Sequence, residues 1–546
     1  MSAMKLFCLC TVILLFAVCG SQGAAMDPLS QANRLPPSLE KTVQDFQSAV
    51  IKEGYEVARG YWTLWSADDC KLPLQTVGFC YGNNPTSPYV LAIVPPWKNE
   101  FVDQSWNMQH MLIEGRKGMI PNYRLGEREA LVVFAQLPPP ARYFGLGTNV
   151  FTRQAKLNQT DPAYVRLDTP ETQDLLKIIF GASPNPDRLM MIATIGDTIN
   201  NVVIENQSNE SWGQRRFFVI TPDEMMAQAM TKAFKQVGVD WTHVFTEPVG
   251  FVDPDNPSKP NLVRLGYGSE ADDFITYIRY SMPNDATLGE QWREQLPLTI
   301  LRVRDPNGGK AENPFKIQQY DPKVANYDET ALKDDLSKLV AAVKDYWGQT
   351  SDNNSADFKS LSLWVDLIGQ HCLGYDGPPA PDPKEHITLP RGPMDCLGDN
   401  QDADYQISGG KYHLDDDQVI AVVGTLGTET RNATYSSLSV NWFPELVGVL
   451  NRDDPVLQGS AVKFKGKLSD PTRYKYFYVY YFARDCSGLY PWCQEVPRTL
   501  VPRGDTIKII QRNYVNPGKT RGPNPNKVLN PVSIQFDGRK GMRPTN

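Results

Sequence analysis

Residues 217–238, FFVITPDEMMAQAMTKAFKQVG, decide the fold class because they place a strand pattern directly before a framed helix. The apolar run 217–220 ends at the tetrapeptide TPDE (221–224), which supplies a capping hydroxyl, a proline for the first helical turn and two acids at the positive end of the helix dipole. Apolar side chains then recur at spacings of three and four until Gly238, which predicts the helix end. This stretch therefore predicts a protein that mixes strands with amphipathic helices.

The same two patterns recur on both sides of this stretch. Helices are predicted from Ser38 over Leu39, Val43, Phe46 and Val50, and from about Glu329 to Trp347. Short apolar runs bounded by turn residues predict strands at 89–94, 130–137 and 189–195. After the polar stretch 349–356 the strand pattern dominates, at 361–367, 419–423, 435–442, 474–482 and 507–510. We therefore predict a mixed α+β fold, α/β-like in its N-terminal and central region and mostly antiparallel β in its C-terminal third.

Length and composition allow a chain with a sizeable core. The sequence has 546 residues, of which 41% are hydrophobic and 21% charged, and this composition excludes a disordered protein. We predict a signal peptide at 1–23, a mixed α/β domain at 24–348 and a β-rich domain with an acidic loop at 349–546. The net charge of -7 and the absence of long basic blocks argue against a nucleic-acid partner. No internal repeat of solenoid or propeller length is evident.

The first 25 residues follow the pattern of a secretory signal peptide. Lys5 precedes an apolar run from Leu6 to Val18 and then small residues, so cleavage is predicted after Gly23 or Ala25. The alternative, a membrane anchor, fits less well because this run is too short to span a bilayer as a helix. No later stretch is long and apolar enough, so we expect no membrane span after cleavage and a secreted, extracellular protein.

Cysteines and glycosylation sequons agree with export. Six cysteines lie beyond the leader and allow 15 pairings; because they cluster in twos we predict the local pairs Cys70–Cys80, Cys372–Cys396 and Cys486–Cys493. Zinc binding is a weaker alternative, since the sequence has no Cys-x-x-Cys pair. Five Asn-x-Ser/Thr sequons predict N-linked glycans, at Asn158, Asn206, Asn209, Asn353 and Asn432.

The polar region 371–417 is the first candidate for chemistry. It holds three of the five histidines, and a histidine beside carboxylates can act as a general base near neutral pH. The candidate catalytic residues are His371, Tyr405, His413 and Asp415. The alternative is a set of solvated surface turns.

Asp399, Asp402 and Asp404 offer hard oxygen ligands in the same region and are candidate Ca²⁺ ligands. The order of an EF-hand loop is missing, so a solvated acidic loop remains the competing interpretation. The cofactor prediction is accordingly none or Ca²⁺.

The run 474–482, YKYFYVYYF, is a candidate ligand-binding strand. Because alternate residues of a strand share a face, Tyr474, Tyr476, Tyr478 and Tyr480 would form one row that stacks on a sugar or a planar small molecule. The alternative is that these rings are core.

Two further motifs each have a structural alternative. Gly196-Asp197-Thr198, with the spacing Asp240 to His243, resembles the first block of Gly-Asp-Ser-Leu lipases and esterases, with a threonine in place of the nucleophilic serine. The alternative is a turn or a helix cap at Asp197. Gly518-Lys519-Thr520 imitates a phosphate-binding loop but lacks the leading glycine.

Two functions remain open from the sequence. The first is a secreted, glycosylated, disulfide-bonded acid/base enzyme of the hydrolase type that needs no cofactor. The second is a non-catalytic extracellular glycoprotein that binds a glycan or a small molecule through its tyrosines.

Overall fold

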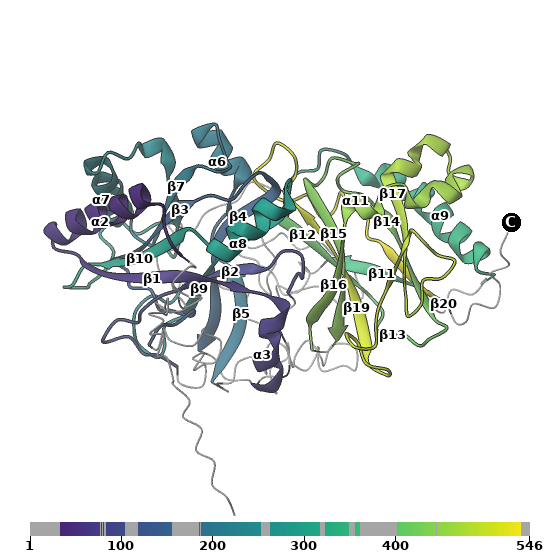
Figure 1. Ribbon diagram of the computed structural model, residues 1–546, viewed down its shortest axis with the longest axis horizontal. Helices are drawn as coiled ribbons and strands as arrows, with labels where there is room; N and C mark the ends of the chain where they lie inside the picture. The colour runs from purple at the N-terminus through teal and green to yellow at the C-terminus, as the bar shows by residue number, and fades with distance from the viewer. Residues whose placement is uncertain are drawn as a thin grey trace, which may run out of the picture.

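The structure is a computed structural model that describes residues 33–76, 78, 80, 83–103, 118–154, 185, 187–252, 263–316, 323–348, 355–360, 401–443 and 445–536. Two ten-stranded sheets divide these residues into a first half, 33–316, and a second half, 323–536, which lie side by side (Figure 1). Both sheets contain parallel and antiparallel pairs, and helices pack on them. The predicted mixed α+β class is confirmed at this level.

The first sheet has the strand order β5-β4-β9-β2-β1-β10-β3-β7-β8, with β6 paired to β4. Its strands are β1 Glu56–Trp65, β2 Tyr89–Ile93, β3 Glu129–Gln136, β4 Ala141–Gln154, β5 Arg188–Thr194, β6 Ile199–Asn200, β7 Arg215–Thr221, β8 Val244–Pro248, β9 Asp273–Pro283 and β10 Leu298–Arg304. Strands β2, β3, β5 and β7 confirm the predicted apolar runs.

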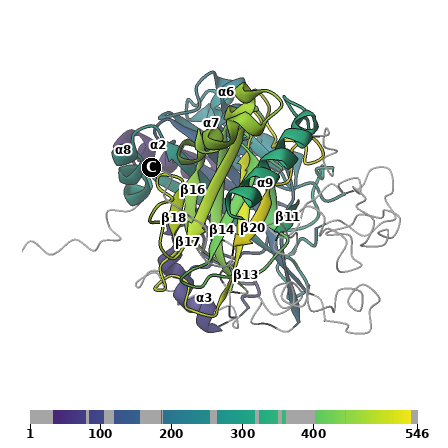
Figure 2. The same cartoon turned by 90° about the vertical axis from the view of Figure 1, so that its right-hand side faces the viewer.

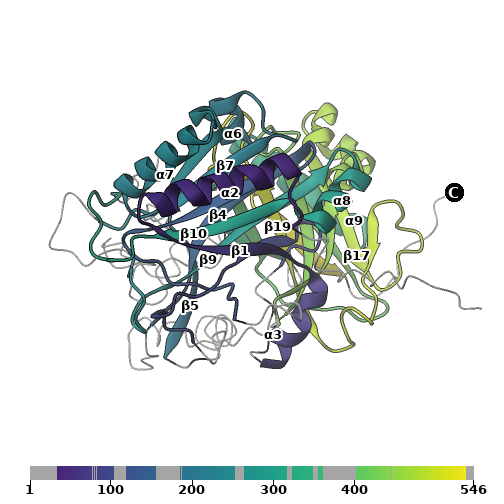
Figure 3. The same ribbon diagram turned by 60° about the vertical axis from the view of Figure 1, so that its left-hand side comes forward.

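Helices α2 (Pro37–Lys52) and α7 (Glu224–Gln236) lie together on the outer face of this sheet (Figure 3). The predicted apolar face of α2 is confirmed, since Leu39, Val43, Phe46 and Val50 are all buried. Asp223 caps α7 by accepting a hydrogen bond from Met225 N. Alternate residues of β3 and β7 point to the opposite face and form the interior core.

The first sheet is curled so that strands from its two ends meet. Strand β8 is last in the strand order and β4 is second, yet the Glu247 carboxylate of β8 accepts hydrogen bonds from Thr148 N (2.7 Å) and Thr148 Oγ1 (2.9 Å) of β4. A buried side chain therefore joins these two parts of the curled sheet.

The second sheet has the order β16-β15-β19-β12-β11-β20-β14-β17-β18, with β13 paired to β19. Its strands are β11 Ser355–Ser360, β12 Ala403–Ser408, β13 Tyr412–His413, β14 Val419–Thr425, β15 Tyr435–Phe443, β16 Val447–Asp453, β17 Phe477–Ala483, β18 Cys493–Glu495, β19 Thr506–Tyr514 and β20 Val532–Phe536. The remaining elements are α3 Lys71–Thr76, α6 Asn201–Ser208, α8 Ala286–Gln295, α9 Lys333–Tyr346, α11 Asp454–Leu457, η1 Ala67–Cys70, η3 Trp241–His243, η4 Glu329–Leu332, η7 Ser460–Lys467 and η8 Pro471–Tyr476.

Helix α9 covers the outer face of the second sheet, across β14 and β20 (Figure 2). The helix predicted near 329–347 is thus confirmed, with Leu336, Leu339 and Val343 buried. Because it packs on the second sheet, α9 belongs with the second half.

The two sheets have matching connectivity, in contrast to the expected difference between an α/β-like first part and an antiparallel last third. In each sheet the pairs along this order are antiparallel except for one parallel pair, β7 with β8 and β17 with β18. The structure places helices α2 and α7 on the outer face of a sheet that is antiparallel in all but one of these pairs.

Polar side chains join the halves. Arg279 of β9 donates hydrogen bonds to the hydroxyls of Tyr89 in its own half (2.9 Å) and of Tyr405 in the other half. Tyr143 donates to Asp402 Oδ2 at 2.8 Å. Within the described residues, no helix is long and apolar enough to cross a membrane.

Candidate functional site

A hollow of about 490 Å³ opens on the second half and is lined mostly by polar and charged side chains. Four separate segments contribute to it: the residues before η4, the connection from β14 to β15, the end of η8 and the connection from β19 to β20. The lining residues are Asn326, Tyr327, Glu429, Thr430, Arg431, Tyr476, Pro517, Gly518 and Lys519. We call this the tyrosine–arginine hollow.

Two cations of the hollow sit on tight turns. The β14–β15 turn is closed by Asn432 N donating to Gly427 O (2.7 Å), and Arg431 adopts a left-handed φ of 60° within it. In the β19–β20 turn, Lys519 N donates to Asn516 O at 2.8 Å. Within the described part of the chain, neither cationic head group has a carboxylate at ion-pair distance, so both are available to an anion.

Asn326 ties these two turns together. Its side-chain Nδ2 donates to Arg431 O and to Pro517 O, each at 2.9 Å. A single amide therefore bridges the backbones of the two turns that carry the cations. Such a bridge reduces the ordering cost of binding a ligand that contacts both turns.

Two tyrosines form the aromatic part of the hollow. The rings of Tyr327 and Tyr476 are stacked, with centroids 5.9 Å apart and an interplanar angle of 20°. Tyr327 is held by Asn432, whose Oδ1 accepts from Tyr327 N (3.0 Å) and whose Nδ2 donates to Tyr327 O (2.9 Å). No hydrogen bond of either hydroxyl is found among the described residues, so both phenols can bond to a ligand.

The buried Glu329 fixes the floor beneath these groups. Its carboxylate accepts hydrogen bonds from Thr425 Oγ1 (2.6 Å), Thr430 Oγ1 (2.6 Å), Asn432 Nδ2 (2.9 Å) and Leu529 N (3.0 Å). Glu429 at the rim accepts from Gln458 Nε2 at 2.9 Å. The side chains around the hollow are thus positioned by satisfied polar contacts.

The β19–β20 connection also reaches the first half. Arg521 makes a bidentate pair with Asp197, with Nε–Oδ1 at 2.9 Å and Nη2–Oδ2 at 2.8 Å, and Asn200 Nδ2 donates to Thr520 O at 2.7 Å. The esterase-like Gly196-Asp197-Thr198 motif therefore takes part in the joint between the halves. Asp240 caps η3 by accepting from Thr242 N, so both blocks of that motif have a structural role here.

The described members of the predicted catalytic set, Tyr405, His413 and Asp415, do not converge on one site. His413 is exposed and its Nδ1 lies 3.0 Å from Gly504 O, while Asp415 pairs with Arg503 at 3.4 Å. Tyr405 is buried at the joint, and burial raises the pKa of its hydroxyl well above the ordinary value for tyrosine. His413 pairs with Thr506 and Tyr405 with Arg512 on the same strand, which separates them by about 20 Å at the strand rise. His371 lies outside the described residues.

The described members of the predicted Ca²⁺ set are buried: Asp402 lies at the joint between the halves and Asp404 lies within β12. Asp402 is fully buried and accepts from Tyr143, and burial raises its pKa. Asp404 is also fully buried, in β12, and Asp399 lies outside the described residues. Within the described ranges, no group of three histidine, cysteine, aspartate or glutamate side chains is arranged to hold a metal ion.

The four tyrosines of the predicted row do not share one strand face. Asp470 accepts from Thr472 N (2.8 Å) and Pro471 follows it, so residues 471–476, which include Tyr474 and Tyr476, form η8. Tyr478 and Tyr480 follow in β17, where each is only 1% exposed in the interior core. Of this row, Tyr476 is the member that lines the hollow.

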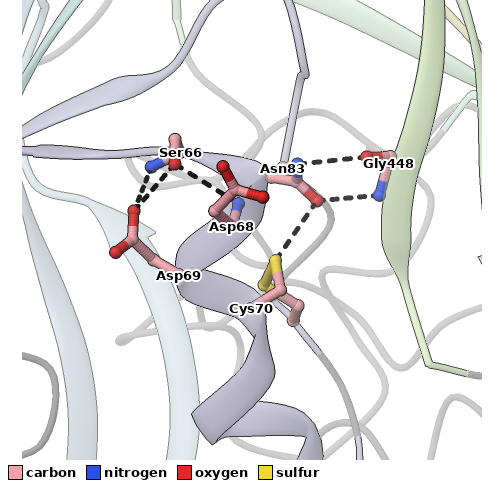
Figure 4. The surroundings of a disulfide bond; sticks show 7 residues. Ser66, Asp68, Asp69, Cys70, Asn83 and Gly448 are labelled. Atoms are coloured by element: carbon pink, nitrogen blue, oxygen red, sulfur yellow. Dashed lines mark hydrogen bonds between the residues drawn. A yellow bond between two sulfur atoms is a disulfide. The ribbon is translucent and has the colours of Figure 1, made fainter.

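Two of the predicted disulfides, Cys70–Cys80 and Cys486–Cys493, are confirmed. Cys372 and Cys396 lie outside the described residues. Near the first disulfide, Asn83 bonds both backbone groups of Gly448 in the second half, donating to its O (3.2 Å) and accepting from its N (2.7 Å) (Figure 4). The segment that follows this disulfide thus contacts strand β16.

The sequons differ in access. Asn206 and Asn209 are exposed at the end of α6. Asn432 is fully buried and its Nδ2 donates to Tyr327 O and Glu329, so a glycan has no space there in this fold. Asn158 and Asn353 lie outside the described residues.

Sequence reasoning missed Arg431 and most of the hollow. Its lining comes from four segments far apart in the chain, and no spacing pattern links them. The available signal was local: Lys519 of the Gly518-Lys519-Thr520 stretch lies on a tight turn beside prolines and asparagines.

The sequence matches no family of known proteins and no curated protein. Among solved structures, an uncharacterised protein from Burkholderia cenocepacia aligns with 92% of this chain and 88% of its own, at 10% identity and a TM-score of 0.33. This likeness is too weak to support an inference about fold or function.

Proposed function

We propose that this protein is an exported glycoprotein that binds a small acidic saccharide in the tyrosine–arginine hollow. The observation that carries the proposal is the pair of unpaired cations, Arg431 and Lys519, facing a hollow that also presents two free tyrosine hydroxyls. Of the two functions left open by the sequence, this is the binding function. It has more support than the hydrolase because, among the described acid/base candidates, Tyr405 lies about 20 Å from His413 at the strand rise.

The chemistry of the lining favours an anion that also carries hydroxyl groups. A guanidinium can hold a carboxylate or sulfate through two hydrogen bonds, and an ammonium adds a second charge. The phenols of Tyr327 and Tyr476 can exchange hydrogen bonds with sugar hydroxyls, and their ring carbons can contact the C–H face of a sugar ring. A volume of about 490 Å³ is in the usual range for small-molecule sites.

Calorimetry with matched sugars tests this proposal. We expect a uronate-containing disaccharide to bind at least about tenfold more tightly than the same disaccharide with its carboxyl reduced to an alcohol. Arg431→Ala and Lys519→Ala should each weaken uronate binding by about tenfold, and Lys235→Ala, an exposed lysine on α7, should leave it unchanged. Equal affinity in Arg431→Ala and wild type would contradict the proposal.

The same titration separates binding from hydrolysis. If the calorimeter or a chromatographic assay detects turnover of the disaccharide that His413→Ala abolishes, the hydrolase hypothesis is favoured. We expect stoichiometric binding without turnover.

Export and glycosylation are part of the proposal. The leader pattern, the two disulfides and the exposed sequons at Asn206 and Asn209 support it. Mass spectrometry of protein collected from the culture medium should find the leader absent and a glycan at Asn206 or Asn209. Intracellular protein with an intact leader and no glycan would refute this part.

A further inference from the structure

We infer that the chain is a fused duplication of one ancestral domain, and that the surface joining its halves descends from the contact surface of a homodimer. The first observation is topological. The two strand orders correspond position by position, and corresponding strands also follow one another in the same order along the chain, with the short strands β6 and β13 as additions. The single parallel pair stands at the same end of both orders.

The registers of the two sheets correspond as well. In the first sheet one row of paired residues runs across β10, β3, β7 and β8 through Arg302, Leu131, Ile220 and Glu247. In the second sheet the corresponding row runs across β20, β14, β17 and β18 through Gln535, Ile420, Phe482 and Gln494. When the two rows are aligned, Leu137, the residue directly after β3, corresponds to Leu426, the residue directly after β14.

Sequence identity survives in one strand pair. Residues 143–151 read YFGLGTNVF and residues 435–443 read YSSLSVNWF, so both contain the pattern Tyr-x-x-Leu-x-x-Asn-x-Phe. These segments are the corresponding strands β4 and β15. Four matching side chains in one register, in strands that already correspond by topology, favour common descent over convergence on a curled sheet.

The partner strands extend the match. Gly145 of β4 pairs with Arg279, which pairs on its other side with Tyr89. Ser437 of β15, the equivalent of Gly145, pairs with Arg512, which pairs with Tyr405. Both arginines are buried, and three residues beyond each of them Met282 and Val515 adopt the left-handed φ values 56° and 40°, which are rare for such side chains.

The joint is built from these equivalent residues. Arg279 bonds to Tyr89 and also to Tyr405, the counterpart of Tyr89. Arg512 lies over the Tyr405 ring at 5.7 Å, as Arg279 lies over the Tyr89 ring at 4.7 Å. Arg279 thus contacts Tyr405, which is the strand neighbour of its own counterpart Arg512. Such contacts are characteristic of a two-fold interface, in which both copies present the same patch.

Cleavage of the full chain tests the inference. A protease site placed within residues 317–322 allows the peptide chain between the two halves to be cut after folding. We expect light scattering at micromolar concentration to give the mass of the uncleaved protein, because a former dimer interface holds its partners without a covalent link. Separation of the wild-type halves under these conditions would overturn the inference.

Matched arginine variants test the equivalence of the two patches. Arg279→Met and Arg512→Met should each weaken the association of the cleaved halves by at least about tenfold. Arg216→Met, a buried arginine bonded to backbone carbonyls within the first half, should leave the association unchanged. An effect of only one of these two equivalent arginines contradicts the equivalence.

Conservative variants keep the test informative if a methionine variant does not fold. Tyr405→Phe removes only the hydroxyl that accepts from Arg279 across the joint and should weaken association several-fold. Tyr89→Phe removes the equivalent hydroxyl within the first half and should leave association near the wild-type value. Melting curves of the uncleaved variants show whether each is folded, and a reversed order of these two effects contradicts the proposed geometry.

Discussion

The corresponding rows of the two curled sheets hold different chemistry in the same places. In the first half the row begins with Arg302 and ends with Glu247; in the second half it begins with Gln535 and ends with Gln494. The first half thus buries ionisable side chains at positions where the second half has half-buried amides. One strand arrangement therefore tolerates either solution, and differences in stability and pH response between the halves should originate in these positions.

The two halves also differ in the connection between their last two strands. Between β9 and β10 the first half has helix α8, whose Trp292 Nε1 donates to Gln136 O at 3.0 Å. The corresponding β19–β20 connection has no helix and supplies Pro517, Gly518 and Lys519 to the tyrosine–arginine hollow. The second half thus presents a hollow where the first half places a packed helix, which is consistent with a binding function confined to one copy.

The largest effect is expected from removing the buried charge of Arg302 in the first half. Arg302 donates to Glu129 (2.6 Å) and to Glu100 (2.7 Å), and all three side chains are inaccessible to solvent. Arg302→Met leaves two buried carboxylates unpaired and should cost about 3 to 5 kcal/mol in the free energy of unfolding, measured by denaturant titration. Gln535→Met, at the corresponding position, should cost about 1 kcal/mol or less. Equal costs would remove the distinction between the halves.

The second effect depends on pH. Burial raises the pKa of Glu247 from its ordinary 4.5 to about 7, against hydrogen bonds from Thr148 that lower it. The folded protein therefore retains a proton that the unfolded chain releases, and stability falls as pH rises from about 4.5 to about 7. Glu247→Gln, which copies Gln494 of the second half, should raise stability by about 3 kcal/mol at pH 8 and change it little at pH 4.

Melting temperatures across this pH range check the prediction for Glu247. Gln494 is half-buried, so the reciprocal variant Gln494→Glu should lose less stability at high pH than the buried Glu247 costs the first half. A gain in Glu247→Gln that is the same at pH 4 and pH 8 would mean that packing, and not ionisation, distinguishes the two residues.

The crossovers of the two parallel pairs provide the third comparison. The first half connects β7 to β8 through helix α7, whereas the second half connects β17 to β18 through a short loop closed by Cys486–Cys493. Replacing both cysteines by alanine should cost about 2 to 3 kcal/mol, the loop entropy released to the unfolded chain. Hydrogen exchange should show loss of protection in β17 and β18 and none in α7. Loss spread over both halves would contradict their independence.

The smallest expected effect concerns helix α8. Asp285 caps it by accepting from Leu288 N at 3.0 Å, and Asp285→Ala should cost about 1 kcal/mol. Uronate affinity should not change, because α8 belongs to the half without the hollow. A change in affinity measured by calorimetry would show that the two connections are coupled.

Local patterns predicted several of the elements but not their assembly. Spacings of three and four identified α2, α7 and α9, and short apolar runs identified β3, β14 and β15, because burial of one face imposes a period on the sequence. Clustering of cysteines gave the two observed disulfides. These features depend only on residues close in the chain.

The duplication and the hollow depend on residues far apart. Between β4 and β15 only four of nine positions match, since a core accepts many apolar side chains in one register. The tyrosine run was misjudged at its start because Asp470 and Pro471 begin a 3-10 helix before β17. A capping aspartate followed by proline was the available signal for that break.

The contact of Asn83 with Gly448 also bears on how the protein avoids self-association. Strand β16 is the last in its sheet, and an outermost strand exposes backbone groups that another molecule can use to extend the sheet. The Asn83 amide occupies both backbone groups of Gly448, and a side chain at that glycine would collide with Asn83 O at 2.1 Å. The segment that follows the Cys70–Cys80 bridge in one half thus covers the open edge of the other at Gly448, which hinders edge-to-edge pairing there.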